Sequence, residues 1–134
     1  MAFVETKGLK GAALNLVVAE CLDIHWDEAS GCFVWPKNEQ GKERYSMEAP
    51  NYSADWSLAG EIIENEKIEL QRCEGEWVAS SSAPVQYETH RQHVFTSGET
   101  APIAAMRCFV TCKWGPVVEI PEKFLSKPSS GMSL

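Results

Sequence analysis

Three pairs of cysteine and histidine residues have the spacing of metal ligands. The members of each pair are three or four residues apart: Cys21 with His25, His90 with His93, and Cys108 with Cys112. Zinc requires four nitrogen or sulfur ligands in a tetrahedron, which two helices could supply. A buried free cysteine, however, behaves as a small hydrophobic side chain. Because Cys112 has helical spacing with Phe109 and Ala105, we expect it in the core, and we predict no metal site and no cofactor.

The same residues could in principle form a nucleophile and its base. Such a pair needs a thiol that a neighbouring base activates, and no cysteine of this chain lies in a nucleophile motif. The sequence has no G-x-S-x-G motif and no glycine-rich phosphate loop. Because the chain holds 19 acidic residues, paired carboxylates are unavoidable and indicate no reaction. We predict no catalytic residue.

Aromatic, acidic and arginine side chains form the third candidate group, and their chemistry would be recognition. Trp56 follows Asp55 at a predicted helix start, and exposed tryptophan or arginine side chains are typical of binding hot spots. Arg107 is expected opposite the core face of its helix, where it can pair with Asp55 or Glu64 or face a partner. We therefore predict a binding role for Asp55, Trp56, Glu64 and Arg107. The simpler expectations are a core position for most of the five tryptophans and an ordinary salt bridge for Arg107.

Length and charge bound the class of protein. A chain of 134 residues is expected to form one domain, here residues 1–125, with a flexible tail at 126–134. The net charge of −7 argues against direct nucleic-acid binding, because phosphate contacts need lysine and arginine. No apolar run is long enough to span a membrane, and because the first residues lack the pattern of a signal peptide, we expect none. With an odd number of cysteines, which favours reduced thiols, these features predict a cytoplasmic protein.

Three segments are predicted to be helices. The first covers residues 9–24 and is apolar on most sides, which is typical of a central, buried helix. The second ends at Glu66 and begins at a cap formed by Ser53 or Asp55. The third covers residues 101–114, between a capping threonine and a Gly-Pro stop. Gly60 inside the second helix indicates either a close contact or a break.

The predicted strands are short. They cover residues 32–35, 44–47, 85–89 and 117–120, and residues 25–31 are predicted to be an exit loop. The clearest signal is a β-hairpin at about residues 67–80, where two alternating segments flank Glu74-Gly75. We predict an α+β fold in which two or three helices pack on one mainly antiparallel sheet. The first and third helices should contact each other.

Three blocks of sequence, taken in order, resemble one protein family. The first is Gly-Ala-Ala-Leu-Asn-Leu-Val-Val-Ala-Glu-Cys at residues 11–21. The second joins Tyr-Ser-Ala-Asp-Trp at 52–56 and Gly-Glu-Ile-Ile-Glu at 60–64 to Glu-Trp-Val-Ala at 76–79. The third is Thr-Ala-Pro-Ile-Ala-Ala-Met-Arg-Cys-Phe-Val at 100–110, followed by Lys-Trp-Gly and Val-Glu-Ile-Pro. Together they resemble the phage NinX family of small proteins from tailed phages and prophages. The resemblance implies a phage origin, action inside a bacterial host and no particular reaction.

We therefore expect a phage or prophage accessory protein that binds a host or phage protein. Two alternatives stay open. A small enzyme with an unfamiliar site would show a deep pocket with His90, His93 or a cysteine beside a base. An acidic mimic of nucleic acid, which would block a host DNA-binding protein, would align its acidic residues on one face.

Overall fold

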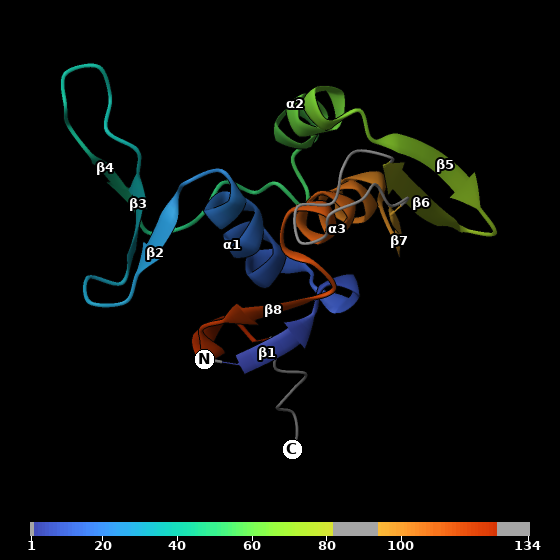
Figure 1. The fold of residues 1–134 in the computed structure, drawn as a ribbon, viewed down its shortest axis with the longest axis horizontal. Coiled ribbons are helices and arrows are strands. Elements are labelled where there is room, and N and C mark those ends of the chain that lie inside the picture. Colours follow the sequence, from blue (N-terminus) through green and yellow to red (C-terminus); the bar gives the residue numbers. More distant parts are fainter. Residues whose placement is uncertain (1, 82–93, 126–134) are drawn as a thin grey trace.

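A computed structural model describes residues 2–81 and 94–125 of the chain (Figure 1). These residues form an α+β fold, as predicted. The predicted strand at 85–89, the histidines at 90 and 93 and the predicted tail at 126–134 lie outside the described residues. The elements, in chain order, are β1 (Ala2–Glu5), η1 (Thr6–Gly8), α1 (Gly11–Cys21), β2 (His25–Asp27), β3 (Cys32–Trp35), β4 (Arg44–Ser46), α2 (Trp56–Glu66), β5 (Glu69–Cys73), β6 (Glu76–Ser81), β7 (Val94–Gly98), α3 (Ala101–Trp114), β8 (Val117–Ile120) and η2 (Glu122–Phe124). Among the described helices, none has the length and apolar character needed to cross a membrane.

The strands form three small antiparallel sheets rather than the single sheet predicted. Their orders are β1-β8, β2-β3-β4 and β5-β6-β7. In the β2-β3-β4 and β5-β6-β7 sheets, each strand pairs with the next strand in the sequence, so these two sheets form from local segments of the chain. The third joins the two ends of the described chain, with Ala2 opposite Ile120 and Glu5 opposite Val117. Figure 1 shows the sheets on different sides of the helices.

Helix α3 lies at the centre of the fold. Thr100 caps its start by accepting a hydrogen bond from the Ile103 amide, and Pro102 lies in its first turn, where a missing amide costs nothing. Gly115 ends it with a positive φ of 93° while its amide donates to Thr111. The helix contacts α1, α2, β6 and β7. The predicted core face is confirmed as buried, namely Ala105, Met106, Phe109 and Cys112.

Helix α1 is central, as predicted, but shorter than residues 9–24. Its buried positions run from Ala13 to Ala19. The segment after it is a strand, β2, and the prediction of a loop there is wrong for residues 25–27. His25 pairs with Val34 of β3, and the Glu20 carboxylate accepts hydrogen bonds from the Trp26 amide and the His25 ring. These contacts order a segment whose own sequence has no clear period.

The second helix and the hairpin follow the sequence closely. Asp55 caps α2 by accepting from the amides of Ser57 and Leu58. The hairpin of β5 and β6 turns at Glu74 and Gly75, which both have the positive φ of a type I′ turn. Gly60 marks neither a break nor a close contact, because α2 is continuous and a methyl group there would meet nothing within 4 Å.

Gly98 is the glycine that packing requires. It ends β7 where this strand meets the first turn of α3. A Cβ atom at this position would lie 2.8 Å from the Ala104 amide nitrogen and 2.8 Å from a methyl group of Ile103. The strand can therefore approach the helix only without a side chain here.

We expect Gly98→Ala to lower the free energy of unfolding by about 1–3 kcal/mol, because the added methyl group overlaps backbone. Gly60→Ala is the matched control, and it should raise the free energy by about 0.5–1 kcal/mol, since alanine favours a helix and the space is open. Urea denaturation of both variants measures the difference. Equal stabilities would contradict the close approach of β7 and α3.

Candidate functional site

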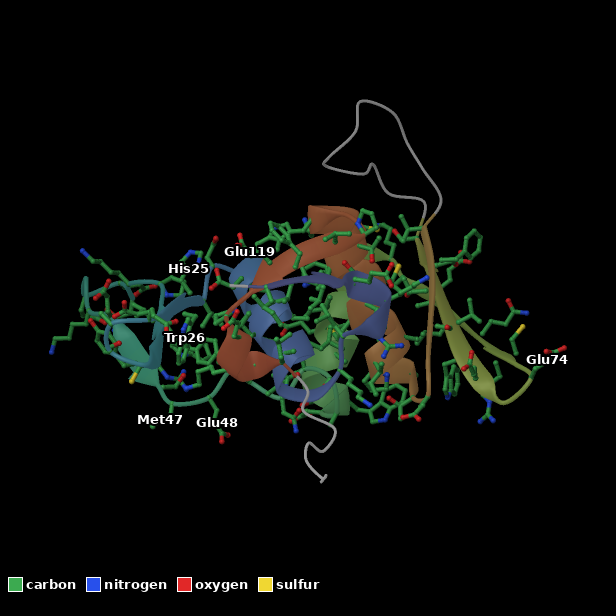
Figure 2. The ribbon with its side chains drawn as sticks, turned by 90° about the horizontal axis from the view of Figure 1, so that it is seen from below. His25, Trp26, Met47, Glu48, Glu74 and Glu119 are labelled. Carbon is green, nitrogen blue, oxygen red and sulfur yellow. The ribbon has the colours of Figure 1, made fainter. Side chains whose placement is uncertain are left out.

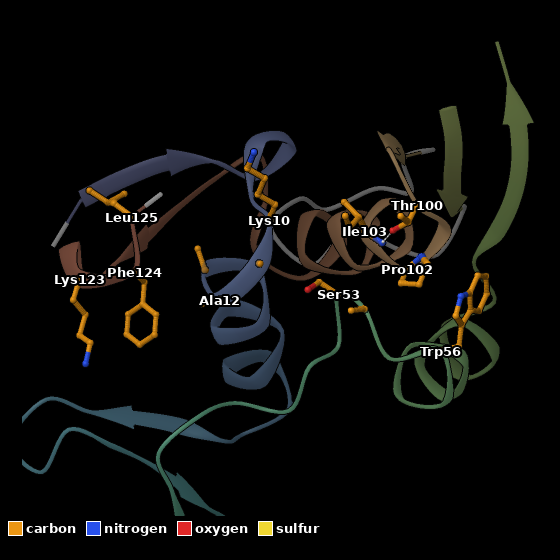
Figure 3. A pocket seen from close by; sticks show the side chains of 13 residues that line it. Lys10, Ala12, Ser53, Trp56, Thr100, Pro102, Ile103, Lys123, Phe124 and Leu125 are labelled. Atoms are coloured by element: carbon orange, nitrogen blue, oxygen red, sulfur yellow. Dashed lines mark hydrogen bonds between the residues drawn. The ribbon is translucent and has the colours of Figure 1, made fainter. Parts of the chain in front are cut away.

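A hollow in the described part of the chain forms a groove at the starts of all three helices (Figure 3). Its volume is about 620 Å³. We call it the three-helix groove. Two smaller hollows, of about 350 and 300 Å³, adjoin it on either side of Phe124 and Leu125. It is lined by Lys10, Gly11, Ala12 and Ala13 from α1, Ser53, Ala54 and Trp56 at α2, Thr100, Pro102 and Ile103 at α3, and Lys123, Phe124 and Leu125 at η2.

Arg107 fixes the α1 and α3 walls of the groove relative to each other. Its Nε donates to the Leu9 carbonyl oxygen over 2.8 Å, and its Nη1 donates to the Ser97 carbonyl oxygen over 2.7 Å. Leu9 comes just before the start of α1, and Ser97 lies shortly before the start of α3. Partial burial lowers the pKa of the guanidinium, while the carboxylates of Glu99 and Glu76 act in the opposite direction. The group stays charged, and charged donors make the stronger hydrogen bonds.

Asn15 fixes the α2 wall. Its side chain is buried in α1, and its Oδ1 accepts from the Ser53 amide over 2.8 Å. Its Nδ2 donates to Asn51 Oδ1 over 3.1 Å. Because both ends of the amide are bonded, the burial of a polar side chain is compensated. The loop that leads into α2 is therefore held against α1.

An aromatic cluster fixes the fourth wall, η2. The Phe124 ring lies 5.0 Å from the Trp26 ring and 6.1 Å from the Phe33 ring, in edge-to-face geometry. Lys123 Nζ lies 4.7 Å from the centre of the Trp26 ring, a cation–π contact. The segment after β8 is thus attached to the β2-β3-β4 sheet, with Lys123 at the edge of the groove.

The charges in the groove differ in sign from those of the protein as a whole. Its described lining holds two lysines and no carboxylate, imidazole or thiol. Asp55 and Thr100 cap α2 and α3, whereas Lys10 gives α1 no side-chain cap. The positive end of the α1 dipole therefore opens toward the groove beside an ammonium group.

The four residues predicted to bind do not form one site. Trp56 lies in the groove, with 58% of its surface exposed. Asp55 faces its own helix, where hydrogen bonds from the hydroxyl and amide of Ser57 lower the pKa of its carboxyl group. Glu64 lies farther along α2 and lines no part of the groove. Arg107 bonds to backbone oxygens instead of to Asp55 or Glu64.

The tryptophans are less buried than predicted. Trp26, Trp35 and Trp77 pack partly buried against the core, whereas Trp56 and Trp114 are exposed. The two exposed tryptophans lie on helices α2 and α3. Trp35 lies on β3, where its Nε1 donates to Ser46 and the Arg44 guanidinium lies over its ring.

The cysteine and histidine pairs within the described residues do not converge. Cys108 and Cys112 are buried in α3 as core residues. His25 Nδ1 lies 2.8 Å from Glu20, and burial raises the pKa of Cys21 to about 12, so this thiol stays protonated. No group of three metal-binding side chains gathers in the described ranges.

Sequence reasoning missed Lys10, Lys123 and Phe124. The two lysines are separated by nearly the whole chain, and no local pattern links them. Because the predicted first helix begins at residue 9, Lys10 falls inside it, and only the structure places this lysine at the position before the helix.

We expect Arg107→Gln to lower the free energy of unfolding by about 2–3 kcal/mol, because two carbonyl groups lose a charged donor. Lys42→Gln, which removes the same charge from an exposed loop, should change it by less than about 0.5 kcal/mol. Thermal and urea unfolding measure both variants. Equal effects would mean that Arg107 does not connect the two helix starts.

Lys10→Gln should leave the free energy of unfolding unchanged or raise it by about 0.3–1 kcal/mol, because a cation at the positive end of a helix is unfavourable. The matched control is Lys7→Gln, outside this helix start, which should have no effect. A loss of more than about 1 kcal/mol for Lys10→Gln would show that the lysine supports the fold rather than a ligand.

Comparison with known proteins places the chain in a family. The model of the family described as "Bacteriophage P22, NinX" matches residues 5–113. The match includes the starts of all three helices and ends before η2. No curated protein matches the chain. The resemblance read from the sequence is thus confirmed, and the chain belongs to the phage NinX family.

Proposed function

We propose that this protein is a phage or prophage accessory protein that acts in the cytoplasm of the bacterial host by binding another protein through the three-helix groove. The single observation that carries this proposal is the exposed Trp56 ring at one end of a groove with fixed walls. An exposed tryptophan beside a hollow has the chemistry of an interface hot spot. Family membership supports the phage setting.

The shape of the groove favours a polypeptide segment as the ligand. In Figure 3 the groove runs from Lys123 and Phe124, past Lys10, to Trp56. Four separate elements line it, and two adjoining hollows, lined in part by Glu5 and Glu48, extend it. An extended segment contacts such a surface along its length, with side chains reaching individual hollows.

The enzyme alternative has less support. The described lining offers two hydroxyl groups and two ammonium groups, but it includes no carboxylate, imidazole or thiol. Those are the groups that most often serve as general bases or nucleophiles. The arrangement therefore suits binding better than acid–base catalysis.

The places of three exposed glutamates give no support to a nucleic-acid mimic. Figure 2 shows Glu48, Glu74 and Glu119 on different parts of the molecule: after β4, at the hairpin turn and in β8. A mimic would need its carboxylates in rows on one face. A protein that binds through its groove does not need its carboxylates in such rows.

We expect affinity capture from phage-infected or lysogenic cells to recover a specific protein with the wild-type chain. Trp56→Ala should lose that protein, because removing a hot-spot side chain weakens binding by about tenfold or more. The matched control is Trp114→Ala, which removes another exposed tryptophan, 42% exposed, outside the groove.

Quantitative mass spectrometry of the captured proteins, in replicate, checks this expectation. A partner retained equally by both variants would place the interface elsewhere. Recovery of no specific protein would argue against a protein-binding function altogether.

A further inference from the structure

The three-helix groove is a local exception to the charge of the molecule. The chain carries 19 acidic and 12 basic residues, yet the described lining contains only lysines among charged side chains. Neither Lys10 nor Lys123 forms an ion pair with a described carboxylate, since the ion pairs within 4.0 Å involve His25. The two lysines in the lining therefore have no counter-ion from the described part of the protein, and Figure 3 shows their ammonium groups at opposite edges of the groove.

Lys10 stands in an unfavourable place for the free protein. It occupies the position before α1, where serine, threonine, aspartate and asparagine are preferred, and its backbone is extended. A cation here repels the positive end of the helix dipole. An anionic group in the groove would interact favourably with both the ammonium and the first-turn amides of α1. The position of Lys10 is thus unfavourable for the stability of the free protein and favourable for binding an anionic ligand.

Lys123 is held in place by aromatic rings. Its Nζ lies 4.7 Å from the Trp26 ring centre and 5.5 Å from the Phe124 ring centre. These contacts restrict a flexible side chain while leaving its three N–H donors available, because a ring face is not a hydrogen-bond partner of the usual kind. A restricted ammonium group loses less entropy when it binds an anion.

Apolar surface lies at both ends of this charged region. Trp56 is exposed at one end, and Phe124 and Leu125 are partly exposed at the other. The combination matches a ligand that alternates anionic and apolar groups. It is poorly matched to nucleic acid, whose continuous phosphates need more than two cations on a surface of net charge −7.

We propose that the three-helix groove binds an acidic segment of the partner protein, with carboxylates at Lys10 and Lys123 and an apolar side chain against Trp56. This proposal rests on the proposed protein-binding function and names the chemistry of the segment. Charge complementarity between the lysine-lined groove and the segment carries it.

The test is selection of random dodecapeptides displayed on a surface, with the full-length wild-type protein as bait. The selected sequences should be enriched in aspartate and glutamate around one aromatic or aliphatic residue. Fluorescence anisotropy of the synthesised consensus peptide should show about tenfold weaker binding to the double variant Lys10→Gln/Lys123→Gln, since each exposed ion pair contributes modestly. Binding should also weaken as salt is added.

A matched double variant, Lys7→Gln/Lys37→Gln, removes the same net charge outside the groove and should bind the peptide as the wild type does. Tenfold losses in both double variants would overturn the proposal, because they would report overall charge alone. Selection of no peptides, or of peptides without acidic enrichment, would overturn it as well.

Two further outcomes would replace the ligand. Tighter binding of a labelled single-stranded oligothymidylate than of the peptide, lost in Lys10→Gln/Lys123→Gln, would assign the groove to nucleic acid. Self-association in sedimentation experiments, abolished by Trp56→Ala, would assign it to a second copy of the chain. If a cellular partner depends on Trp56 while selected peptides lack acidic residues, the charge assignment fails and the protein-binding function stands.

Discussion

The fold depends on the need to cover a helix that has buried side chains on almost every side. Helix α3 has nine buried positions among its residues, and its neighbours come from both helices and from the β5-β6-β7 sheet. A helix of this kind is stable only when it is enclosed, because exposed apolar surface costs free energy in water. The β5-β6-β7 sheet covers one side of it, and α1, α2 and η1 cover other sides. Residues at the starts of the three helices that pack together here line the groove.

The groove and the core share their supports. Arg107 belongs to the central helix, yet its guanidinium bonds to the backbone just before α1 and shortly before α3. Asn15 similarly connects a buried helix to the loop that leads into α2. Binding residues held by such contacts lose little freedom when a partner arrives, which favours affinity. Lys10 differs from Arg107 and Asn15, because no such contact within the described residues supports it. Its positive charge is repelled by the positive end of the α1 dipole, and a bound anion would compensate this repulsion.

Local signals explain what could be predicted from the sequence. Thr100, Pro102 and Gly115 specify the ends of α3, and Glu74-Gly75 specifies a hairpin, because caps and turns depend on a few adjacent residues. The pairing of β1 with β8 joins segments from opposite ends of the described chain, and no local pattern encodes it. The candidate site was found only in part for the same reason. Trp56 stood out by residue type, whereas Arg107 bonds to backbone oxygens, and Lys10 and Lys123 line one groove only after the chain has folded.

The central claim is that a protein partner occupies the starts of the three helices. Amide hydrogen exchange of the protein, free and bound to its captured partner, tests it most directly. First-turn amides without a cap, as in α1, lack an acceptor and exchange quickly until a ligand covers them, whereas amides that are already bonded, such as those of Ser53 and Ile103, gain a smaller protection. The account predicts new protection at residues 10–14, 53–56, 101–104 and 122–125. Protection confined to the β2-β3-β4 sheet or to the β5-β6 hairpin, with these four segments unchanged, would contradict it.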